Sequence, residues 1–599
     1  MASQSEIERT TLRTGMVGSL EASRAGETVR LSGWVHRRRD LGGLLFVDLR
    51  DRSGIVQISF GPEWTEADAL ALAGKLGRED VVHVEGEVAL RPEGARNTEI
   101  ATGDVEVQAA RLRVLGKART PAIPVYRGPE DELPAEELRL QHRSLDLRRP
   151  ELQENLRLRH RLVLETRNYL SGLGFLEIET PILTKATPEG ARDYLVPSRV
   201  HKGEFYALPQ SPQIYKQLLM VSGFDRYFQI ARCFRDEDLR ADRQPEFTQI
   251  DVEASFVEPE DILRWIEGLA IALAGVGGVD APSPFPRLTW AEAMERYGSD
   301  RPDLRFGLEL SDWTDATSDM DFGVIRGAVE KGGRVRGLHV PGGARLSRKQ
   351  IDAVEATAKA AGAPGLLWVK RNDDGFSGPL GRFMADGHAE RMGLAVGDLA
   401  FAAAGPDTVT SPALSATRAA VARALELRAD REDAWLWVTD FPVFEEMDGE
   451  VYASHHPFVM PHPDDLDLLE TDPVSVRGTA YDLVYNGTEL GSGSIRIHEP
   501  DLQRRVLKVL GMSDAEIDAK FGFLLDALST GAPPHGGIAL GVDRIVQRFS
   551  RSESLRDVIA FPKTTAARAL YEGAPTPVGA RELEELGLII APDARKKGV

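Results

Sequence analysis

The chain has 599 residues, and its 73 Lys and Arg against 93 Asp and Glu give a formal net charge of −20 at pH 7. This length predicts roughly four domains at about 150 residues each, and a negative field of this size repels nucleic acid unless a local basic surface offsets it. The single cysteine, Cys233, excludes an internal disulfide and a cysteine-rich zinc site. Because no apolar run reaches the ~18 residues of a membrane span and no secretory signal is recognisable, we expect a cytoplasmic protein without membrane contact.

The N-terminal part of the chain differs from the rest in charge. Residues 9–60 contain nine Arg and only five Asp or Glu. Strand-like alternation marks residues 28–39, 44–51, 54–60, 81–90 and 105–115, with a helical stretch near 65–77. Five strands with a helix between the third and the fourth predict an OB-fold β-barrel.

One aromatic side chain of this barrel is expected to point outward. Alternate residues of a strand face opposite sides, so Val47 and Leu49 share the core face while Phe46 lies on the other. Arg39 and Gln57 are expected beside it. An exposed aromatic ring next to such groups is typical of a surface that stacks single-stranded bases. A barrel with one exposed phenylalanine and ordinary surface arginines is the alternative.

Composition divides the remainder of the chain. Residues 117–150 carry Pro121, Pro124, Pro129 and Pro134 among charges, which is typical of a hinge. A helical pattern over 151–173 and a strand-like FLEIETPIL at 175–183 begin a second domain. Residues 306–430 are rich in Ala and Gly, with strand-helix-strand segments that predict an inserted α+β domain. The strand-like segment 435–444 resembles in composition the part of the chain before residue 306, so the second domain is expected to resume there.

Residues 226–256 predict two strands around a charged loop, with one apolar and one polar face. On the second strand Ile250 and Val252 alternate with Asp251 and Glu253. Arg235, at the end of the first strand, suits a phosphate group, because a guanidinium donates two parallel hydrogen bonds. The alternative is a solvated hairpin whose charges pair with one another.

The segment SPQIYKQLLM predicts a helix that begins near Pro212. Gln213 and Lys216 are three residues apart and therefore share a face of this helix. An amide beside an ammonium group can bind a carboxylate ligand, although surface helices often carry such pairs without a ligand.

The Asn-Gly pair at 486–487 lies between two strand-like runs and predicts a β-hairpin. If Val484 pairs with Glu489, then Asp482 and Glu489 lie on one face as diagonal neighbours. Two carboxylates this close repel each other unless a cation lies between them, and hard oxygen ligands suit Mg²⁺ bound to a substrate phosphate. A structural hairpin with exposed acids is the alternative.

Arg496 follows on the second strand of this hairpin. Strict alternation places it on the face opposite Glu489, so it joins the site only if Gly491 or Gly493 forms a β-bulge. Further on, residues 535–549 predict a glycine-led strand that continues into a helix with Arg544 in its first turn, an arrangement that binds anions.

Together these segments resemble the three motifs of class II aminoacyl-tRNA synthetases, in chain order GFLEIETPIL, FRDE through RQPEFTQID, and GGIALGVDR. Class I signatures and a Walker A P-loop are absent from the sequence. The N-terminal OB domain is similar to that of the aspartate, asparagine and lysine subgroup. The strings TPEGARDYLVP, QSPQIYKQLLM and GSGSIRIH, with the inserted domain, resemble the bacterial-type aspartyl-tRNA synthetases.

The resemblance implies an α+β multidomain fold. Its parts are an OB-fold anticodon-binding domain at 1–116, a hinge at 117–150, a catalytic domain on an antiparallel sheet at 151–305 and 431–585, an inserted GAD-like domain at 306–430 and a C-terminal tail at 586–599. It further implies a homodimer, with the first motif, around Pro181, at the subunit interface.

The resemblance also implies a two-step ligase reaction. Aspartate and ATP give aspartyl-adenylate and pyrophosphate, and the aspartyl group then passes to the terminal adenosine of tRNA-Asp, with Mg²⁺ as the cation. Such chemistry depends on positioning and charge neutralisation.

Roles for individual residues follow from matching the motifs. Arg235 and Arg544 are expected to be catalytic, at the α-phosphate and the γ-phosphate, and Asp482 and Glu489 to hold Mg²⁺. Aspartate is expected to contact Glu189, Gln213, Lys216, Arg235, Asp251, His455 and Arg496. ATP is expected to contact Arg235, Asp236, Glu237, Gln244, Glu489, Gly541, Val542, Asp543 and Arg544. The anticodon is expected to contact Arg39, Phe46 and Gln57.

Three alternatives stay open at this point. A relaxed ligase would charge both tRNA-Asp and tRNA-Asn. A non-catalytic tRNA-binding regulator could keep the same scaffold, although the intact arginines and carboxylates argue against it. A tRNA-independent amidating enzyme that makes asparagine could share the catalytic fold, but it has no need of an anticodon reader.

Overall fold

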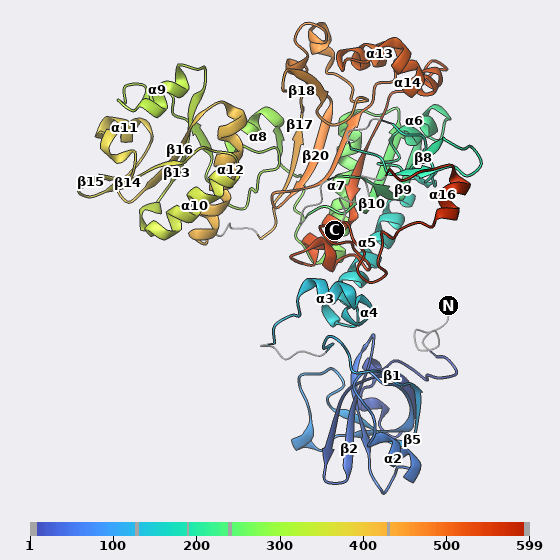
Figure 1. The fold of residues 1–599 in the computed structure, drawn as a ribbon. Coiled ribbons are helices and arrows are strands. Elements are labelled where there is room, and N and C mark those ends of the chain that lie inside the picture. Colours follow the sequence, from blue (N-terminus) through green and yellow to red (C-terminus); the bar gives the residue numbers. More distant parts are fainter. Residues whose placement is uncertain (1–8, 126–130, 188–190, 238–241, 428–431, 592–599) are drawn as a thin grey trace. The chain divides into compact units, whose positions relative to one another are not determined.

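The computed structural model describes residues 9–125, 131–187, 191–237, 242–427 and 432–591. The chain falls into two compact units (Figure 1). The first contains Met1–Glu154 with Ala560–Thr564 and Arg568–Pro575, and the second contains the rest. Among the described residues no helix is long and apolar enough to cross a membrane.

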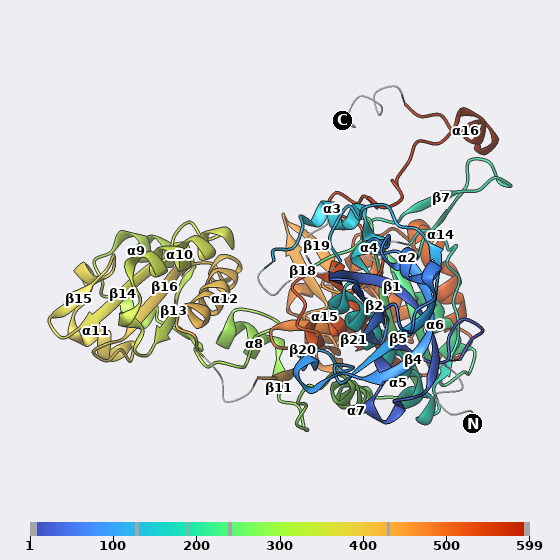
Figure 2. The ribbon, with the colours of Figure 1, turned by 90° about the horizontal axis from the view of Figure 1, so that it is seen from below.

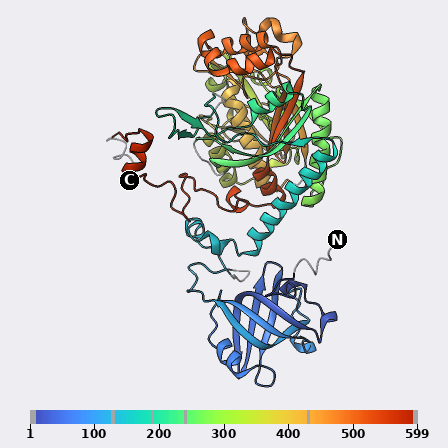
Figure 3. The ribbon, with the colours of Figure 1, turned by 90° about the vertical axis from the view of Figure 1, so that its right-hand side faces the viewer.

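The first unit contains a closed five-stranded barrel with strand order β1-β2-β3-β5-β4. Its elements are β1 (Thr28–Leu41), β2 (Leu44–Asp51), β3 (Gly54–Phe60), α2 (Ala67–Ala73), β4 (Val81–Leu90) and β5 (Val105–Gly116). Figure 3 shows the strands wrapped around a common core. The inward residues of β2 and β3, among them Val47, Leu49 and Ile58, are buried in that core, so the predicted OB-fold barrel is confirmed.

The segment after the barrel contains α3 (Glu136–Gln141) and α4 (Arg143–Asp146). Arg148 donates to Glu79 of the barrel unit at 2.7 Å, and the same carboxylate accepts two hydrogen bonds from Arg50. Burial alone would raise the pKa of Glu79, but the two arginines outweigh it and hold the pKa below its usual range. In this way the segment predicted as a hinge packs with the barrel in one compact unit.

The second unit is built on an eight-stranded sheet with order β11-β17-β20-β21-β22-β10-β9-β6. The strands are β6 (Leu176–Glu177), β9 (Arg226–Phe234), β10 (Glu246–Ser255), β11 (Arg287–Thr289), β17 (Trp435–Thr439), β20 (Ala480–Tyr485), β21 (Thr488–Ile495) and β22 (His535–Gly541). Interior pairs are antiparallel, whereas the edge pairs β11–β17 and β6–β9 are parallel. The predicted antiparallel sheet is therefore mixed at its margins, and the strand expected over 175–183 is only two residues long.

Helices cover the apolar face of this sheet. They are α5 (Pro150–Gly172), α7 (Pro259–Gly277) and α15 (Val542–Phe549). Leu162, Leu269 and Val546 of these helices pack with Ile250, Val252 and Ile538 of the sheet in one core. The opposite, polar face carries α6 (Gln213–Val221), with α13 (Pro500–Val509) and α14 (Asp514–Leu528) packed behind it.

The inserted region has a five-stranded sheet of its own, with order β12-β13-β16-β14-β15. Its elements are β12 (Leu310–Asp312), α9 (Gly323–Val329), β13 (Arg334–Val340), α10 (Arg348–Ala360), β14 (Leu367–Asn372), β15 (Gly375–Ser377), α11 (Asp386–Arg391), β16 (Leu399–Gly405) and α12 (Asp407–Ala424). Helices α10 and α12 share one core with the sheet, and α9 and α11 share the other. Figure 2 shows helices of this region on both sides of its strands. The predicted α+β character is confirmed.

Short elements complete the described chain. They are β7 (Leu195–Pro197), β8 (Phe205–Ala207), α8 (Trp290–Tyr297), β18 (Phe444–Met447), β19 (Glu450–Ala453) and α16 (Ala580–Leu586). Most of the tail predicted at 586–599 lies outside the described residues.

Candidate active site

A cavity of about 390 Å³ opens on the polar face of the large sheet, between strands β10, β21 and β22, helix α6 and the segment that follows β9. Most of the residues predicted from the sequence to form the site line it. They are Gln213, Lys216, Arg235, Glu237, Gln244, Asp251, His455, Glu489, Arg496, Gly541, Asp543 and Arg544.

Three of the predicted residues that the structure describes do not line this cavity, and a fourth falls outside the described residues. Asp236 is half-exposed at the end of β9, where it bridges to Arg192. Val542 is buried in the apolar core, so only its backbone faces the site. Asp482 is buried beneath the cavity lining, next to Ser492. Glu189 lies outside the described residues.

The hairpin of β20 and β21 has the predicted pairing, with Val484 opposite Glu489. It also contains a bulge, because the next residue on β20, Leu483, pairs with Gly491 and leaves Leu490 without a partner. The bulge was predicted at Gly491 or Gly493, but it lies at Leu490, one residue before Gly491. The extra residue reverses the alternation, so that Leu490 enters the core while Glu489 and Arg496 both line the cavity.

The floor of the cavity is a buried set of alternating charges. Lys216 Nζ lies 2.7 Å from Asp251 Oδ1 and 3.2 Å from Glu253 Oε2. Arg496 pairs with Glu253 through Nε to Oε1 at 2.9 Å and Nη2 to Oε2 at 3.1 Å. Burial raises the pKa of Asp251, partly offset by Lys216, whereas Arg496 and Lys216 outweigh burial and lower the pKa of Glu253.

Two histidines cover this floor. Arg496 Nη1 donates to His456 Nε2 at 2.8 Å and to Ser494 Oγ at 2.7 Å. Burial and the neighbouring Arg496 hold the pKa of His456 well below its usual range, and burial also lowers the pKa of His455. Both rings are therefore neutral near pH 7, so His456 can accept from the guanidinium.

Several polar atoms around the cavity are buried without a hydrogen-bond partner. They are Gln213 Nε2, Arg235 Nε, Asp251 Oδ2, His455 Nε2 and Asp482 Oδ1. Buried polar atoms are normally paired, and leaving one unpaired costs about 1–3 kcal/mol. Their concentration here, donors and acceptors together, indicates a site that is completed by a polar ligand.

Two arginines predicted to bind phosphate line the cavity. The Arg235 guanidinium lies 5.1 Å from the centre of the Phe247 ring. Arg544 Nη1 donates to the Glu489 carbonyl at 3.0 Å and lies 3.5 Å from Glu489 Oε1. Asp543 has a supporting role, because its carboxylate accepts from Arg159 and from the Thr248 N–H. Arg544, in the first turn of α15, and Arg235, just after β9, thus bring two cations to the cavity.

The Asp482 and Glu489 pair fits a divalent cation. Burial, followed by the charge of Glu489, raises the pKa of Asp482 well above its usual value, and its Oδ1 has no partner. A cation between the two carboxylates would relieve this repulsion. Within the described residues no group of three or more His, Cys, Asp or Glu side chains can hold a metal, so further ligands would have to come from substrate.

The barrel brings together the three residues predicted to meet single-stranded bases. Arg39 pairs across the strands with Phe46, and its guanidinium lies 5.9 Å from the ring centre. Arg39 Nη2 also donates to Gln57 Oε1 at 3.0 Å and to Asp48 Oδ1 at 2.9 Å. The expected outward direction of Phe46 is confirmed, because its neighbours Leu45 and Val47 are in the core and Phe46 is not.

Two functional neighbours were missed by sequence reasoning. Glu253 holds Arg496 and Lys216, and the alternation along β10 had already placed it on the polar face beside Asp251. His456 follows the predicted His455, but no pattern in the sequence distinguishes it as the partner of Arg496.

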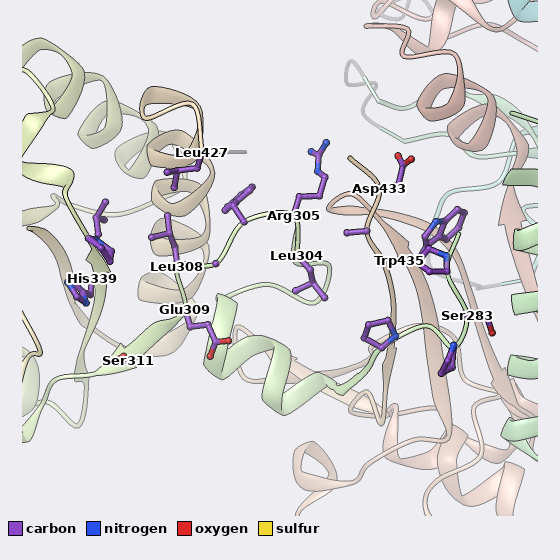
Figure 4. A pocket seen from close by; sticks show the side chains of 18 residues that line it. Ser283, Leu304, Arg305, Leu308, Glu309, Ser311, His339, Leu427, Asp433 and Trp435 are labelled. Atoms are coloured by element: carbon purple, nitrogen blue, oxygen red, sulfur yellow. The ribbon is translucent and has the colours of Figure 1, made fainter. Parts of the chain in front are cut away.

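A second cavity, of about 1180 Å³, lies between the inserted sheet and the segment before β17 (Figure 4). Its charged lining residues already have partners in the protein. Arg305 pairs with Asp303, Glu309 with Arg296, His339 with Asp398 and Asp433 with Tyr485. Its chemistry therefore differs from that of the smaller cavity, where unpaired buried atoms gather.

Comparison with known families agrees with this geometry. The family of class II tRNA synthetases (D, K and N) matches residues 135–565, and the OB-fold nucleic acid binding domain matches residues 29–115. The chain therefore belongs to the class II tRNA synthetases (D, K and N) and is an aminoacyl-tRNA synthetase.

Two relatives are similar to this chain over nearly its whole length. The chain is 50% identical over 586 residues to the aspartate--tRNA(Asp/Asn) ligase of Geobacillus sp. strain WCH70, covering 96% of this chain and 98% of the relative. It is 51% identical over 586 residues to the aspartate--tRNA ligase of Geobacillus kaustophilus, covering 96% and 99%.

Solved structures share the fold at lower identity. An asparaginyl-tRNA synthetase from Pyrococcus horikoshii, complexed with asparaginyl-adenylate, superposes with a TM-score of 0.59 at 19% identity, covering 92% of this chain and 98% of that chain. A putative aspartyl-tRNA synthetase from Leishmania major gives a TM-score of 0.58 at 20% identity, covering 90% and 92%.

Proposed function

We propose that this protein is an aspartate-tRNA ligase. It joins L-aspartate to ATP, giving aspartyl-adenylate and pyrophosphate, and then transfers the aspartyl group to the 3′-terminal adenosine of tRNA-Asp. The observation that carries the proposal is the buried floor of Lys216, Arg496, Asp251 and Glu253, with one acceptor, Asp251 Oδ2, left unpaired. The names of the relatives favour aspartate as the amino acid.

The chemistry of the floor supports aspartate as the amino acid. The four hydrogen bonds that Arg496 donates to Glu253, His456 and Ser494 leave one N–H of Nη2 for a ligand. A carboxylate accepts from this N–H and from the cationic region around Lys216, whereas the NH₂ of asparagine would meet donors with a donor. Asp251 Oδ2 accepts from the amino group of the substrate.

Adenylate formation then depends on placement. The α-carboxylate of aspartate attacks the α-phosphate of ATP, and pyrophosphate leaves. Arg235 neutralises charge at the α-phosphate and Arg544 at the γ-phosphate, while Glu237 and Gln244 line the nucleotide side. Asp482 and Glu489 would hold Mg²⁺, which when bound supplies positive charge to the phosphates.

The remaining assignments concern partners. Arg39, Phe46 and Gln57 of the barrel read the anticodon, and the cavity receives the acceptor end of the tRNA. The enzyme is a cytoplasmic homodimer. Strict charging of tRNA-Asp is the main proposal, and relaxed charging of tRNA-Asp and tRNA-Asn is the alternative that one of the relatives' names favours.

The proposal is tested by aminoacylation with radiolabelled aspartate, ATP and Mg²⁺ on tRNA-Asp and tRNA-Asn transcripts side by side. Charging of tRNA-Asp alone supports the strict ligase, and charging of both supports the relaxed one. Adenylate formation without transfer to either transcript would contradict a tRNA ligase.

A further inference from the structure

One arginine outside the predicted site joins segments that lie far apart in the sequence. Arg159, on α5, donates through Nη1 to the carboxylate of Asp543, the second residue of α15. Its Nη2 donates to the Thr248 hydroxyl of β10 at 2.9 Å. Both acceptor side chains are buried, and the side chain of Arg159 is 19% exposed. The guanidinium is therefore held on α15 and on β10 at once, and it does not line the cavity.

The carboxylate of Asp543 also contacts the backbone of β10. Strand β22 ends at Gly541, which pairs with Gln249 of β10. Beyond this pair the next N–H of β10, that of Thr248, donates to Asp543 Oδ2 at 3.0 Å. A side chain thus replaces the strand as the hydrogen-bond partner at the point where β22 ends and α15 begins. Arg159 holds the other carboxylate oxygen, so both oxygens of Asp543 are engaged by the protein.

These contacts fix the position of the first turn of α15. Arg544 follows Asp543 directly and lines the cavity. Its Nη1 donates to the Glu489 carbonyl at 3.0 Å, so its side chain extends from α15 toward β21. A displacement of about 1 Å at a binding group can reduce a rate by on the order of 10²-fold. The position of Arg544 depends on that of Asp543, and through Asp543 on Arg159.

We propose that Arg159 is a positioning residue for Arg544: by holding Asp543 against β10, it keeps the first turn of α15 in the place from which the Arg544 guanidinium binds the γ-phosphate of ATP. This inference rests on the proposed function, which places Arg544 at that phosphate. It assigns a role in nucleotide binding to a residue of α5 that lies outside the cavity.

The primary experiment measures the dissociation constant of ATP with Mg²⁺ by isothermal titration calorimetry on the full chain, without aspartate. In Arg159→Leu we expect this constant to rise by about tenfold, because a hydrogen bond between charged groups is lost. The aspartate KM in pyrophosphate exchange at saturating ATP should stay nearly unchanged, since Lys216 and Arg496 are not affected. Arg159→Lys keeps a charged donor for Asp543 without the second prong to Thr248, so it should recover most of the ATP affinity.

The loss of Arg159 also leaves a negative charge near the nucleotide, and a paired variant separates charge from position. The paired variant combines Arg159→Leu with Asp543→Asn, so the net charge is unchanged, and the amide oxygen can still accept the Thr248 N–H. If position decides, it should bind ATP about tenfold more weakly than the unaltered protein. Normal affinity would assign the effect to charge alone and overturn the inference. Because the paired variant leaves no unpaired carboxylate, it also decides the question if Arg159→Leu does not fold.

A second background tests whether Arg159 acts through Arg544. Arg544→Leu alone should weaken ATP binding by about tenfold or more, because the phosphate loses a charged partner. In that background the two changes of the paired variant should have no further effect, since changes that act through one interaction are not additive. Arg287→Leu is the matched control, with no change in ATP affinity expected. Arg287 also holds a carboxylate with two nitrogens, at 2.6 and 2.9 Å from Glu260, and it lies on the edge strand β11 and does not line the cavity.

The outcomes separate this inference from the proposed function. If the unaltered protein activates aspartate but the paired variant binds ATP normally, or weakens ATP binding equally in the Arg544→Leu background, the role of Arg159 is wrong. An equal rise in the aspartate KM would make Arg159 a general support of the fold and would also overturn it. If Arg544→Leu keeps its ATP affinity, the proposed role of Arg544 fails, and the inference fails with it. If the unaltered protein does not activate aspartate, the proposed function itself fails.

Discussion

Arg496 and Glu253 form a bidentate ion pair at the bottom of the cavity, with Nε 2.9 Å from Oε1 and Nη2 3.1 Å from Oε2. Both side chains are fully buried. The pair fixes the plane of the guanidinium before any substrate arrives, so the remaining N–H of Nη2 has a defined direction. Affinity for a carboxylate is thereby obtained without ordering a flexible side chain at the moment of binding.

Replacing Arg496 should therefore weaken the binding of aspartate and leave the binding of ATP nearly unchanged. In Arg496→Leu the carboxylate of aspartate loses its partner and Glu253 becomes a buried anion with only Lys216 to balance it. We expect kcat/KM for aspartate in pyrophosphate exchange to fall by at least about 10²-fold, a loss of roughly 3 kcal/mol, with little change in the ATP KM. Arg504→Leu, on the surface of α13, serves as the control. Near-normal kcat/KM would mean that Arg496 does not bind substrate.

Asp482→Asn should separate stability from activity. The raised pKa of Asp482 means that the folded protein binds this proton more tightly than the unfolded chain, so the stability that the protonated form supplies is lost as pH rises through the raised pKa. Asparagine does not ionise. The variant should melt on the order of 1 °C or more higher at neutral pH, with no difference below pH about 4.

In the same variant, exchange activity should fall by about 10²-fold or more, because the proposed cation site loses a ligand. Thermal unfolding at the two pH values, followed by an activity assay with varied Mg²⁺, checks both parts. A variant that is less stable at neutral pH would contradict the electrostatic explanation, and full activity would contradict the metal assignment.

Phe46 should matter only when tRNA is present. Stacking of a base on an aromatic ring contributes about 1–3 kcal/mol, so Phe46→Ala should reduce tRNA charging by roughly tenfold while leaving tRNA-free pyrophosphate exchange nearly unchanged. Leu90→Ala, an exposed apolar position on the same barrel, is the matched control. Equal losses in both assays would show that Phe46 supports the fold and not the anticodon.

The proposed dimer is supported by exposed apolar side chains in the first motif. Leu176, Ile182 and Leu183 are 51%, 42% and 51% exposed, which is unusual for three large hydrophobic residues of one short segment. Light scattering should give twice the chain mass of 65.7 kDa at micromolar concentration, and Leu183→Asp should lower that mass. A value near 65.7 kDa for the unaltered protein would rule out the dimer.

The sequence predicts strands and faces well where alternation is regular. Strands β2, β3 and β4 have the predicted bounds, and the polar face of β10 carries Asp251 and Glu253 as expected. Predictions of which face a residue occupies fail where a bulge or a turn interrupts the alternation. The bulge lies at Leu490 and not at a glycine. Gly491 pairs with Leu483 of β20 and with Leu540 of β22, so its register depends on both neighbouring strands.

Other features depend on contacts that no local pattern contains. Phe256 continues the apolar alternation of β10, yet it is 74% exposed, because the chain turns there with a φ of 57°. The pairing of His456 with Arg496 joins two loops that are 40 positions apart. Tyr227 and Gln229 look like ordinary polar residues of a strand in the sequence, yet Gln229 Oε1 accepts from both the Tyr227 and the Thr180 hydroxyl groups.

The most direct test of the account is ATP–pyrophosphate exchange by the unaltered protein with aspartate and, separately, with asparagine. A buried site built on charge complementarity rejects a near-isostere by about 10⁴-fold, so aspartate should support exchange with kcat/KM larger than that for asparagine by a factor of this order. Exchange with asparagine at a comparable kcat/KM, or no exchange with aspartate, would contradict the assignment of Lys216 and Arg496 as the groups that select the substrate.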